Sequence, residues 1–245
     1  MKFSSITDVG NVREINEDDY YIDSQTEKLF MVADGMGGHK SGDVASKMVI
    51  NILKNYFLKS INKDMELVEI KNKLLEGIKI ANKEVYKLSS KYKELNGMGT
   101  TLNLLYVGQK NLLFLNVGDS RSYIHYNNKL QKITKDHSLV QQLLSNGTIT
   151  ENEAKNHPQK NIITSCLGNK KDYKIDSYIV PKRKSMKILL CTDGLTNLIK
   201  KQEIKEVIEN NNVYLSSKKL VDLAKKYGGF DNITLILLSI ESNED

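Results

Sequence analysis

The stretch FMVADGMGGH, residues 30–39, decides how this chain folds and what it can bind. Residues 30–33 are apolar, which predicts a short buried strand. The run meets an acid, Asp34, and glycine then fills positions 35, 37 and 38. Glycine adopts backbone conformations closed to other residues and lets a ligand approach the main chain closely. Asp34 is therefore either a turn residue or a ligand for a charged group.

The composition is that of an ordinary soluble protein. A chain of 245 residues, 40% hydrophobic and 27% charged, forms one large or two small domains with a substantial core. The net charge is +6, but the lysines are scattered, and the short cluster at 182–184 is interpreted as a solvated turn. The sequence has no concentrated basic stripe of the kind that indicates a nucleic-acid partner. The N-terminus is polar, and no run approaches the roughly 18 apolar residues of a membrane span. We expect a cytoplasmic monomer without a membrane span.

The two cysteines, Cys166 and Cys191, do not have the spacing of a structural zinc site. Their apolar neighbours favour reduced thiols in the core, and a single disulfide remains the alternative. Neither fits the chemistry of a cysteine phosphatase. That chemistry needs an arginine six positions on, where Asp172 and Asn197 stand.

Strand-like segments outnumber helical ones along the chain. Residue types favouring strands, bounded by turn formers, occur at about 3–9, 19–23, 28–33, 101–107, 111–117, 121–126, 174–180, 186–191 and 233–240. Apolar residues three and four apart predict helices at 42–60, 64–92, 137–146, 201–209 and 215–227. The helices come in pairs between groups of strands. This order predicts an α+β fold in which two antiparallel sheets pack together with helix pairs outside.

Acids like Asp34 recur beside other apolar runs. The runs are LLFLNVGD (112–119), ILLCTD (188–193) and DNITLILL (231–238). They carry Asp119, Asp193 and Asp231 at one end. A single aspartate beside glycine is most often a turn former. Four acids at comparable strand ends indicate more, because sheets bring their strand ends together.

A cluster of these acids needs a cation. Carboxylates ~4 Å apart would repel each other by ~4 kcal/mol per pair at an effective dielectric near 20. The cluster stays ionised only if cations neutralise it, and oxygen ligands favour magnesium or manganese. Asp34 is thus predicted to be a metal ligand, and Gly35 to expose its carbonyl as another. The segment REINEDD (13–19) adds Arg13, Glu17 and Asp18.

Eight short motifs in a fixed order carry a family resemblance. They are R-x-x-N-E-D (13–18), ADGMGGH (33–39), GTT (99–101), GDSR (118–121), DHS (136–138), LG (167–168), TDGL (192–195) and DNIT (231–234). Together they resemble the bacterial metal-dependent protein serine/threonine phosphatases of type 2C, the PPM family, from about residue 7 to 240. The resemblance implies a single domain, residues 1–241, built as a four-layer α-β-β-α sandwich. A flap at about 138–172 would lie beside the site.

The resemblance also implies the metal ligands, which would hold two or three Mn²⁺ or Mg²⁺ ions. Asp34 would bridge two ions, with the carbonyl of Gly35 on one of them. Asp193 and Asp231 would complete the other. Asp119, together with Asp193, would serve a third and weaker ion.

Further roles follow from the same resemblance. Arg13 would grip the substrate phosphate through its planar fork of donors. Glu17 and Asp18 would hold metal-bound waters, and Asn232 would stand just outside the ligands. Two cations would create hydroxide from a bridging water near neutral pH, and this hydroxide would attack phosphorus without a covalent enzyme intermediate.

Two positions depart from the family pattern. Eukaryotic relatives have a histidine two residues after the bridging acid, where this chain has Met36. His39 is the nearest candidate to protonate the leaving group and contact substrate, with a metal-bound water as the alternative. Bacterial flaps often carry arginine in a T-R-x-L-G pattern, where TSCLG (164–168) has Ser165. The flap's contacts to substrate are therefore open.

The predicted activity is hydrolysis of phosphoserine and phosphothreonine in proteins. The resemblance implies phosphorylated proteins as partners, either those of an opposing bacterial serine/threonine kinase or regulators of the kind that control sigma factors. One alternative is a two-metal phosphodiesterase or nuclease, which should offer a basic track. Another is a catalytically silent phosphoprotein-binding module of the same fold, which the loss of ligand acids would favour.

Overall fold

The computed structural model describes residues 1–37, 41–62, 64–168 and 173–241. The strands are β1 (Lys2–Asp8), β2 (Asp18–Ile22), β3 (Leu29–Met36), β4 (Gly99–Thr100), β5 (Leu102–Val107), β6 (Asn111–Val117), β7 (Arg121–Tyr126), β8 (Lys129–Lys132), β9 (Asp176–Pro181), β10 (Lys187–Cys191) and β11 (Ile233–Ser239). The helices are α1 (Gly42–Ser60), α2 (Leu67–Lys91), η1 (Lys93–Leu95), α3 (Leu139–Ser145), α4 (Glu151–Lys155), α5 (Asp193–Thr196), α6 (Lys201–Asn210) and α7 (Val213–Lys226).

The strands form two antiparallel sheets. One has the order β1-β11-β10-β7-β8, and the other the order β2-β3-β5-β6-β9 with β4 paired to β3. The first and last strands of the chain, β1 and β11, lie side by side along their whole length. The predicted pair of antiparallel sheets is confirmed.

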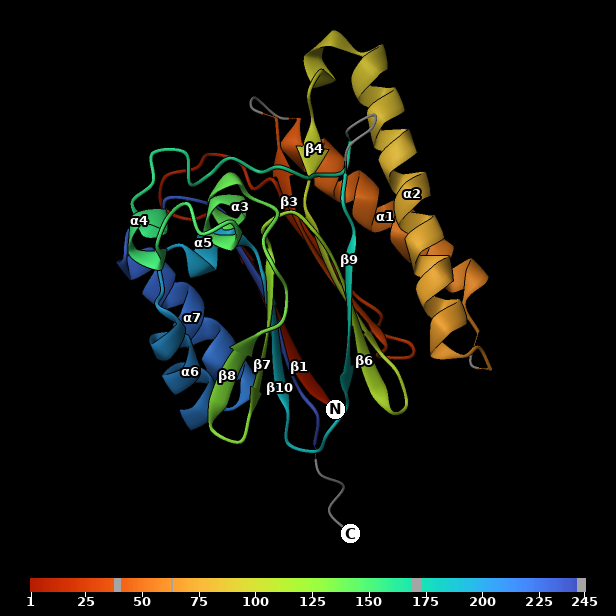
Figure 1. Ribbon diagram of the computed structural model, residues 1–245. Helices are drawn as coiled ribbons and strands as arrows, with labels where there is room; N and C mark the ends of the chain where they lie inside the picture. Colours follow the sequence, from red (N-terminus) through yellow and green to blue (C-terminus); the bar gives the residue numbers. More distant parts are fainter. Residues whose placement is uncertain (38–40, 63, 169–172, 242–245) are drawn as a thin grey trace.

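Helices cover both outer faces of the stacked sheets, as Figure 1 shows. On one side, α1 and α2 pack on the sheet that contains β3, and on the other, α6 and α7 pack on the sheet that contains β11. In β3, Leu29 and Met31 face the helices, whereas Phe30 and Val32 face the other sheet. A strand covered on both faces reads as an unbroken apolar run. The four layers agree with the predicted sandwich.

The structure differs from the prediction where the acids lie. The strand expected to stop at residue 33 continues to Met36, because Gly35 and Met36 pair with Thr100 and Gly99 of β4. Several short elements, among them β4, β8 and α5, were not predicted, since so few residues carry no readable periodicity. The acid of FMVADGMGGH therefore stands inside a strand, not in a turn after one.

The structure also shows the state of the two thiols and the character of the helices. Cys166 and Cys191 are both free, so the interpretation as reduced thiols is confirmed. Within the ranges that the structure describes, no helix combines the length and the apolar character that a membrane crossing needs.

Candidate active site

Strand register places two of the acids beside each other. Asp18 of β2 is the register partner of Asp34 of β3. The backbone of Asp34 is fixed by the next strands: its N–H donates to Thr101 Oγ1 at 3.0 Å, and its carbonyl accepts from the Thr101 N–H at 2.9 Å. The Thr100 hydroxyl donates to the same carbonyl at 2.9 Å. The GTT motif thus anchors the main chain of Asp34 and leaves its carboxylate free to serve the site.

Most of the predicted site residues meet in one pocket of about 530 Å³. Those that line it are Arg13, Glu17, Asp34, Gly35, Asp119, Asp193 and Asp231. Asp18 and Asn232 are not on its surface and are buried, each only 5% exposed. His39 lies outside the residues that the structure describes. The structure therefore collects acids that are up to 214 positions apart, from Glu17 to Asp231.

Burial raises the pKa values of these acids above those of carboxyl groups in water. It raises the pKa of Asp18 to about 7 and that of Asp119 to about 8, and neighbouring carboxylates add to both shifts. Burial also raises the pKa of Asp34 well above its ordinary value, and Asp18 is the largest of the charges that push it further. The pKa of Asp193 is raised by burial and then by Asp231, while a hydrogen bond with Asp34 opposes the shift. The pocket is a strongly acidic site whose charge a bound cation would compensate.

Two carboxylate oxygens without a hydrogen-bond partner indicate how the acidic charge of the pocket could be compensated. Asp18 Oδ1 and Asp119 Oδ1 are buried and accept no hydrogen bond from the described part of the chain. A buried acceptor without a partner costs about 1–3 kcal/mol. Carboxylate oxygens of this kind suit hard divalent ions. Among the described side chains, no three His, Cys, Asp or Glu residues stand as a closed ligand group. The residues fit Mg²⁺ or Mn²⁺ in chemistry, and their side chains would adjust around the ion.

Asn232 fastens the N-terminal loop to this pocket. Its Nδ2 donates to the carbonyls of Val9 and Ile15 at 2.9 and 3.0 Å, and its Oδ1 accepts from the Glu17 N–H at 2.8 Å. The loop that it holds carries Arg13. Asn232 thus holds the loop in place, and its place just outside the metal ligands stays a prediction.

Arg13 lies at the mouth of the pocket. Its guanidinium forms an ion pair with Asp231, with 3.0 Å between NH2 and Oδ2. Both side chains are partly exposed. The pair is therefore accessible, and the donors of Arg13 that Asp231 does not use are available to an anion.

Gly35 is required by the close approach of three segments. A Cβ at this position would lie 2.1 Å from the Gly42 carbonyl oxygen and 2.5 Å from that of Glu17. The Gly35 N–H donates to the Glu17 carbonyl at 3.1 Å, and Glu17 Oε1 accepts from the Gly42 N–H at 3.2 Å. The end of β3, the loop before β2 and the start of α1 are thus pressed together. This packing explains why the first position after Asp34 is a glycine.

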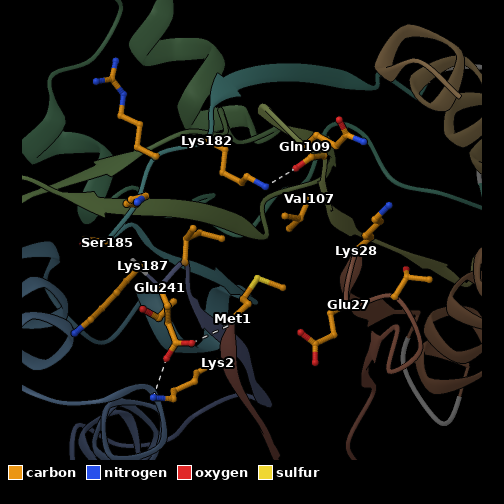
Figure 2. A pocket seen from close by; sticks show the side chains of 16 residues that line it. Met1, Lys2, Glu27, Lys28, Val107, Gln109, Lys182, Ser185, Lys187 and Glu241 are labelled. Atoms are coloured by element: carbon orange, nitrogen blue, oxygen red, sulfur yellow. Dashed lines mark hydrogen bonds and ion pairs between the residues drawn. The ribbon is translucent and has the colours of Figure 1, made fainter. Parts of the chain in front are cut away.

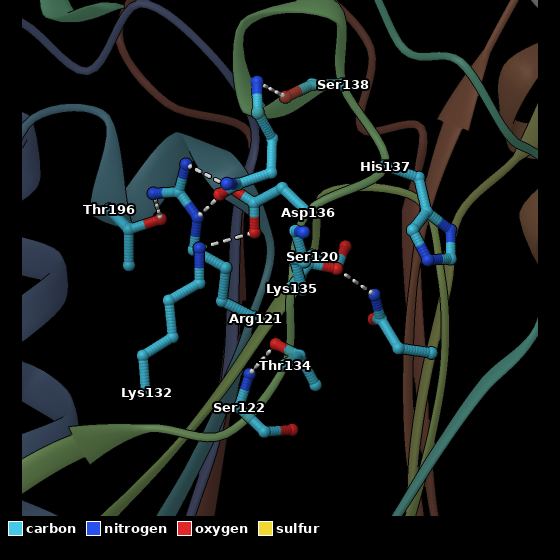
Figure 3. Close-up of polar contacts among 12 residues, drawn as sticks. Ser120, Arg121, Ser122, Lys132, Thr134, Lys135, Asp136, His137, Ser138 and Thr196 are labelled. Carbon is cyan, nitrogen blue, oxygen red and sulfur yellow. Dashed lines mark hydrogen bonds and ion pairs between the residues drawn. The ribbon is translucent and has the colours of Figure 1, made fainter. Parts of the chain in front are cut away.

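A partly buried ionic cluster lies next to the segments that carry two of the acids, and Figure 3 shows its members Arg121, Lys132 and Asp136. Arg121 donates through Nε and NH2 to Asp136 Oδ2 at 3.0 and 2.9 Å, and through NH1 to Thr196 Oγ1 at 2.7 Å. Lys132 completes the cluster with a 2.6 Å contact to Asp136 Oδ1. Thr196 ends α5, the helix that begins at Asp193. Arg121 therefore ties the start of β7, two residues after Asp119, to the helix of Asp193.

The sequence showed Arg121 and Asp136 within the GDSR and DHS motifs but gave them no role. The signal that could have found them is their charge, since an arginine and an aspartate flanking apolar strands need a partner when buried. Burial raises the pKa of Asp193, and the charge of Arg121 opposes that rise. The cluster therefore both positions Asp193 and stabilises its charged form.

The segment predicted to form a flap supplies pocket residues that the sequence did not single out. Lys160, Asn161 and Ile163 line the acid pocket. Ser165, the position where arginine was expected, is buried and accepts a 2.7 Å hydrogen bond from the Lys174 N–H, so it serves the flap's own structure. Phe230, 62% exposed, completes the rim. No periodic pattern marks these residues, because their role depends on how the flap packs.

The metal-free protein is expected to lose thermal stability as the pH rises from about 5 to 8. Asp18 and Asp119 ionise near 3.8 when unfolded but at about 7 and about 8 when folded. Because the pKa of each acid is higher in the folded protein, its proton stabilises the fold fully below pH ~4. This stabilisation is lost as the pH rises through the folded-state pKa values. Melting temperatures in EDTA at pH 5.5 and 8.5 measure this loss. The Asp18→Asn variant should show a smaller drop, and an equal drop in both proteins would contradict the explanation.

Comparisons with known proteins agree with this geometry. A family model described as protein phosphatase 2C matches residues 11–224. The chain is 40% identical over 236 residues to the serine/threonine phosphatase stp of Listeria monocytogenes, covering 95% of this chain and 93% of that protein. It is 34% identical over 249 residues to the protein phosphatase PhpP of Streptococcus pneumoniae, covering 100% of this chain and 99% of that protein.

Solved structures give the same result. The serine/threonine phosphatase Stp1 from Staphylococcus aureus superposes with a TM-score of 0.91 at 38% identity, covering 98% of this chain and 95% of that chain. The catalytic domain of the serine/threonine phosphatase PstP in complex with two manganese ions gives a TM-score of 0.85 at 31% identity, covering 98% of both chains. With the fold, the ordered motifs and the match over most of its length in agreement, this chain belongs to the protein phosphatase 2C family of serine/threonine phosphatases.

Proposed function

We propose that this chain hydrolyses phosphoserine and phosphothreonine in proteins with two or three Mn²⁺ or Mg²⁺ ions held by its acid cluster. The observation that carries the proposal is the set of buried acids that raise one another's pKa and keep unpaired oxygens. A relative of the same fold that is in complex with two manganese ions supports it. The proposed unit is one domain, residues 1–241, with residues 138–172 as its flap.

The proposed ligands follow the pocket's geometry. Asp34 would lie between two ions, with the Gly35 carbonyl on one of them and Asp193 and Asp231 on the other. Asp119 would share a weaker ion with Asp193. When bound, the ions would acidify water near neutral pH, which serves both attack on phosphorus and protonation of the departing alkoxide.

The remaining residues would position the ligands and the substrate. Glu17 and Asp18 would accept hydrogen bonds from waters around the ions, since each offers carboxylate oxygens beside Asp34. Asn232 holds the loop that carries Arg13. Lys160, from the flap, would add a positive charge where the phosphoprotein enters.

Arg13→Ala is expected to raise KM for a phosphothreonine peptide by roughly tenfold to a hundredfold and to change kcat less. The reason is the loss of charge-assisted hydrogen bonds to the phosphate, worth about 1.5–3 kcal/mol. Steady-state kinetics and inhibition by inorganic phosphate both measure it. Arg13→Lys should recover only part of the affinity, because a point charge cannot reproduce the planar fork. An unchanged KM together with unchanged phosphate inhibition would remove Arg13 from the site.

Asp119→Ala is expected to reduce kcat for a phosphoserine peptide much more than kcat for para-nitrophenyl phosphate. A serine alkoxide needs a proton as it leaves, and a nitrophenolate does not. Met36 occupies the position of the eukaryotic histidine, and in this proposal a water held on the Asp119 side of the pocket, rather than His39, would supply that proton. Calorimetry should show that the two tighter ions still bind. Equal losses on both substrates would contradict this role.

The rival activities separate in one comparison of substrates. A phosphatase should hydrolyse phosphothreonine peptides and leave bis(para-nitrophenyl) phosphate, a diester, almost untouched. A phosphodiesterase would show the reverse, and a silent binding module would turn over neither. The pocket favours the first, because acids dominate its lining and Arg13 and Lys160 are its basic residues.

The partners proposed are phosphorylated proteins, among them a serine/threonine kinase and its substrates, met by a cytoplasmic monomer. A kinase-opposing phosphatase predicts that deletion of its gene raises phosphothreonine on the kinase and on its targets. Phosphoproteomics of the deletion strain tests this directly. Phosphorylation that rises only on regulators of sigma factors would assign the chain to the alternative set of substrates.

A further inference from the structure

A second and larger cavity, about 1010 Å³ in volume, lies at the other end of the sandwich (Figure 2). The strands themselves define its position. Lys28 precedes β3 at this end, whereas Asp34 stands near the far end of the same strand. Lys187 begins β10 here, and Asp193 follows the far end of β10. The cavity is therefore separated from the acid pocket by the length of the sheets.

Positive charge dominates the cavity's lining. The basic residues are Lys2, Lys28, Lys182, Arg183, Lys184 and Lys187. The acids that line it are Glu27 and Glu241. Figure 2 shows Lys28 and Lys182 on one side of the cavity and Lys2 and Lys187 on the other. A ligand between these sides would meet cations in more than one direction.

Part of this charge is already engaged. Glu241 contacts the Lys2 ammonium at 2.7 Å and the N-terminal ammonium of Met1 at 3.6 Å. Lys187 Nζ donates to two backbone carbonyls at the end of α6, at 2.6 and 2.8 Å. These groups line the cavity, but their charges already have partners within the protein.

The charge that remains comes from the opposite side and from the turn after β9. Among the ion pairs of the described residues, none joins Lys28, Arg183 or Lys184 to an acid. Lys182 is half-buried and donates to the Gly108 carbonyl at 2.8 Å, so the interpretation of residues 182–184 as a freely solvated turn is wrong for its first member. Burial and then the charge of Lys28 lower the pKa of Lys182. Like charges gathered in one place without ion pairs among the described residues favour the binding of an anion.

The cavity's size and its apolar residues narrow the kind of anion. Its volume is at the upper end of the ~300–1,000 Å³ usual for small-molecule sites. Met1, Val107 and Ile240 add apolar surface among the cations. We propose that this cavity binds a small anion with two or more phosphate groups, such as a nucleoside diphosphate or triphosphate. The phosphates would meet Lys28, Lys182 and Lys184, and the base would lie on the apolar residues.

The test is calorimetric titration of pyrophosphate and of ATP into the metal-free protein in EDTA. Without metal the acid pocket repels anions, so binding reports on the basic cavity alone. We expect one site per chain. Lys28→Ala and Lys184→Ala should each weaken it about tenfold, the size of one charge-assisted contact. The matched control is Lys87→Ala on the exposed side of α2, which removes the same charge and should change affinity less than about twofold.

Several results would overturn the proposal. One is no heat of binding from either probe at millimolar concentration. Another is an equal loss of affinity in Lys87→Ala, which would show general attraction to a basic protein. A doubly phosphorylated peptide that binds where pyrophosphate and ATP do not would assign the cavity to a protein partner instead. Circular dichroism of each variant confirms folding, and since no turnover is measured, the result is independent of the proposed phosphatase mechanism.

Discussion

Chelation with EDTA is expected to abolish hydrolysis of a phosphothreonine peptide, and excess Mn²⁺ or Mg²⁺ to restore it. The acid pocket explains the size of the effect. Asp34, Asp119 and Asp193 line the space where phosphate would bind, and Arg13 already has Asp231 as its partner. A dianionic phosphate cannot enter such a site until cations change its charge. Release of inorganic phosphate from the peptide measures the loss, and far-UV circular dichroism verifies that the chelated protein stays folded.

The recovery of activity when metal is added back is the more decisive step of this experiment. Chelated protein that recovers with Mn²⁺ has lost only its ions, whereas protein that has unfolded will not recover. Metal content before and after chelation should be established by mass spectrometry. Full turnover in a sample shown to be free of metal would rule out the proposed mechanism.

Asp34→Asn is expected to lower kcat by about three orders of magnitude or more, which corresponds to about 4 kcal/mol of transition-state stabilisation. Asparagine keeps the shape of the side chain and removes its charge. Asp34 is the register partner of Asp18, and the charges of four neighbouring aspartates raise its pKa, so it stands at the centre of the cluster. Stability should be retained or should rise without metal, because the substitution relieves repulsion between carboxylates.

A matched control separates charge from position. Asp222→Asn changes the same group on the exposed surface of α7, away from the pocket, and should leave turnover unchanged. Calorimetry would also show weaker Mn²⁺ binding in Asp34→Asn and normal binding in the control. Turnover of Asp34→Asn within tenfold of the wild type at saturating Mn²⁺ would remove Asp34 from the proposed ligands.

The sequence predicted the layers well because they rest on local patterns. The apolar stripes of α1 and α2 and the unbroken run of β3 report directly which faces are buried. The two-residue strand β4 could not be found in this way, since its pairing with Gly35 and Met36 depends on the tertiary fold. The predicted strand end at residue 33 was wrong for the same reason.

The site also contains residues that the sequence could predict and residues that it could not. The acids could be predicted because each stands beside an apolar run and within a recognisable motif. The contact of Arg121 with Thr196 joins residues 75 positions apart, and nothing in either segment indicates the other. Lys160 reaches the pocket only because of the way the flap folds. Sequence patterns identify groups that must be buried, whereas the partners of those groups follow from the fold.

Acids line the pocket at one end of the sheets and cations line the cavity at the other, so the two sites together form a charge dipole along the strands. Before the ions bind, this dipole would turn an approaching phosphoprotein toward the wrong end. Loading the acid end with divalent ions would offset its negative charge and so weaken the field that turns the substrate away. Because such guidance is screened beyond a Debye length of ~8 Å at physiological salt, metal supply and ionic strength would together set the encounter rate, ahead of any chemistry.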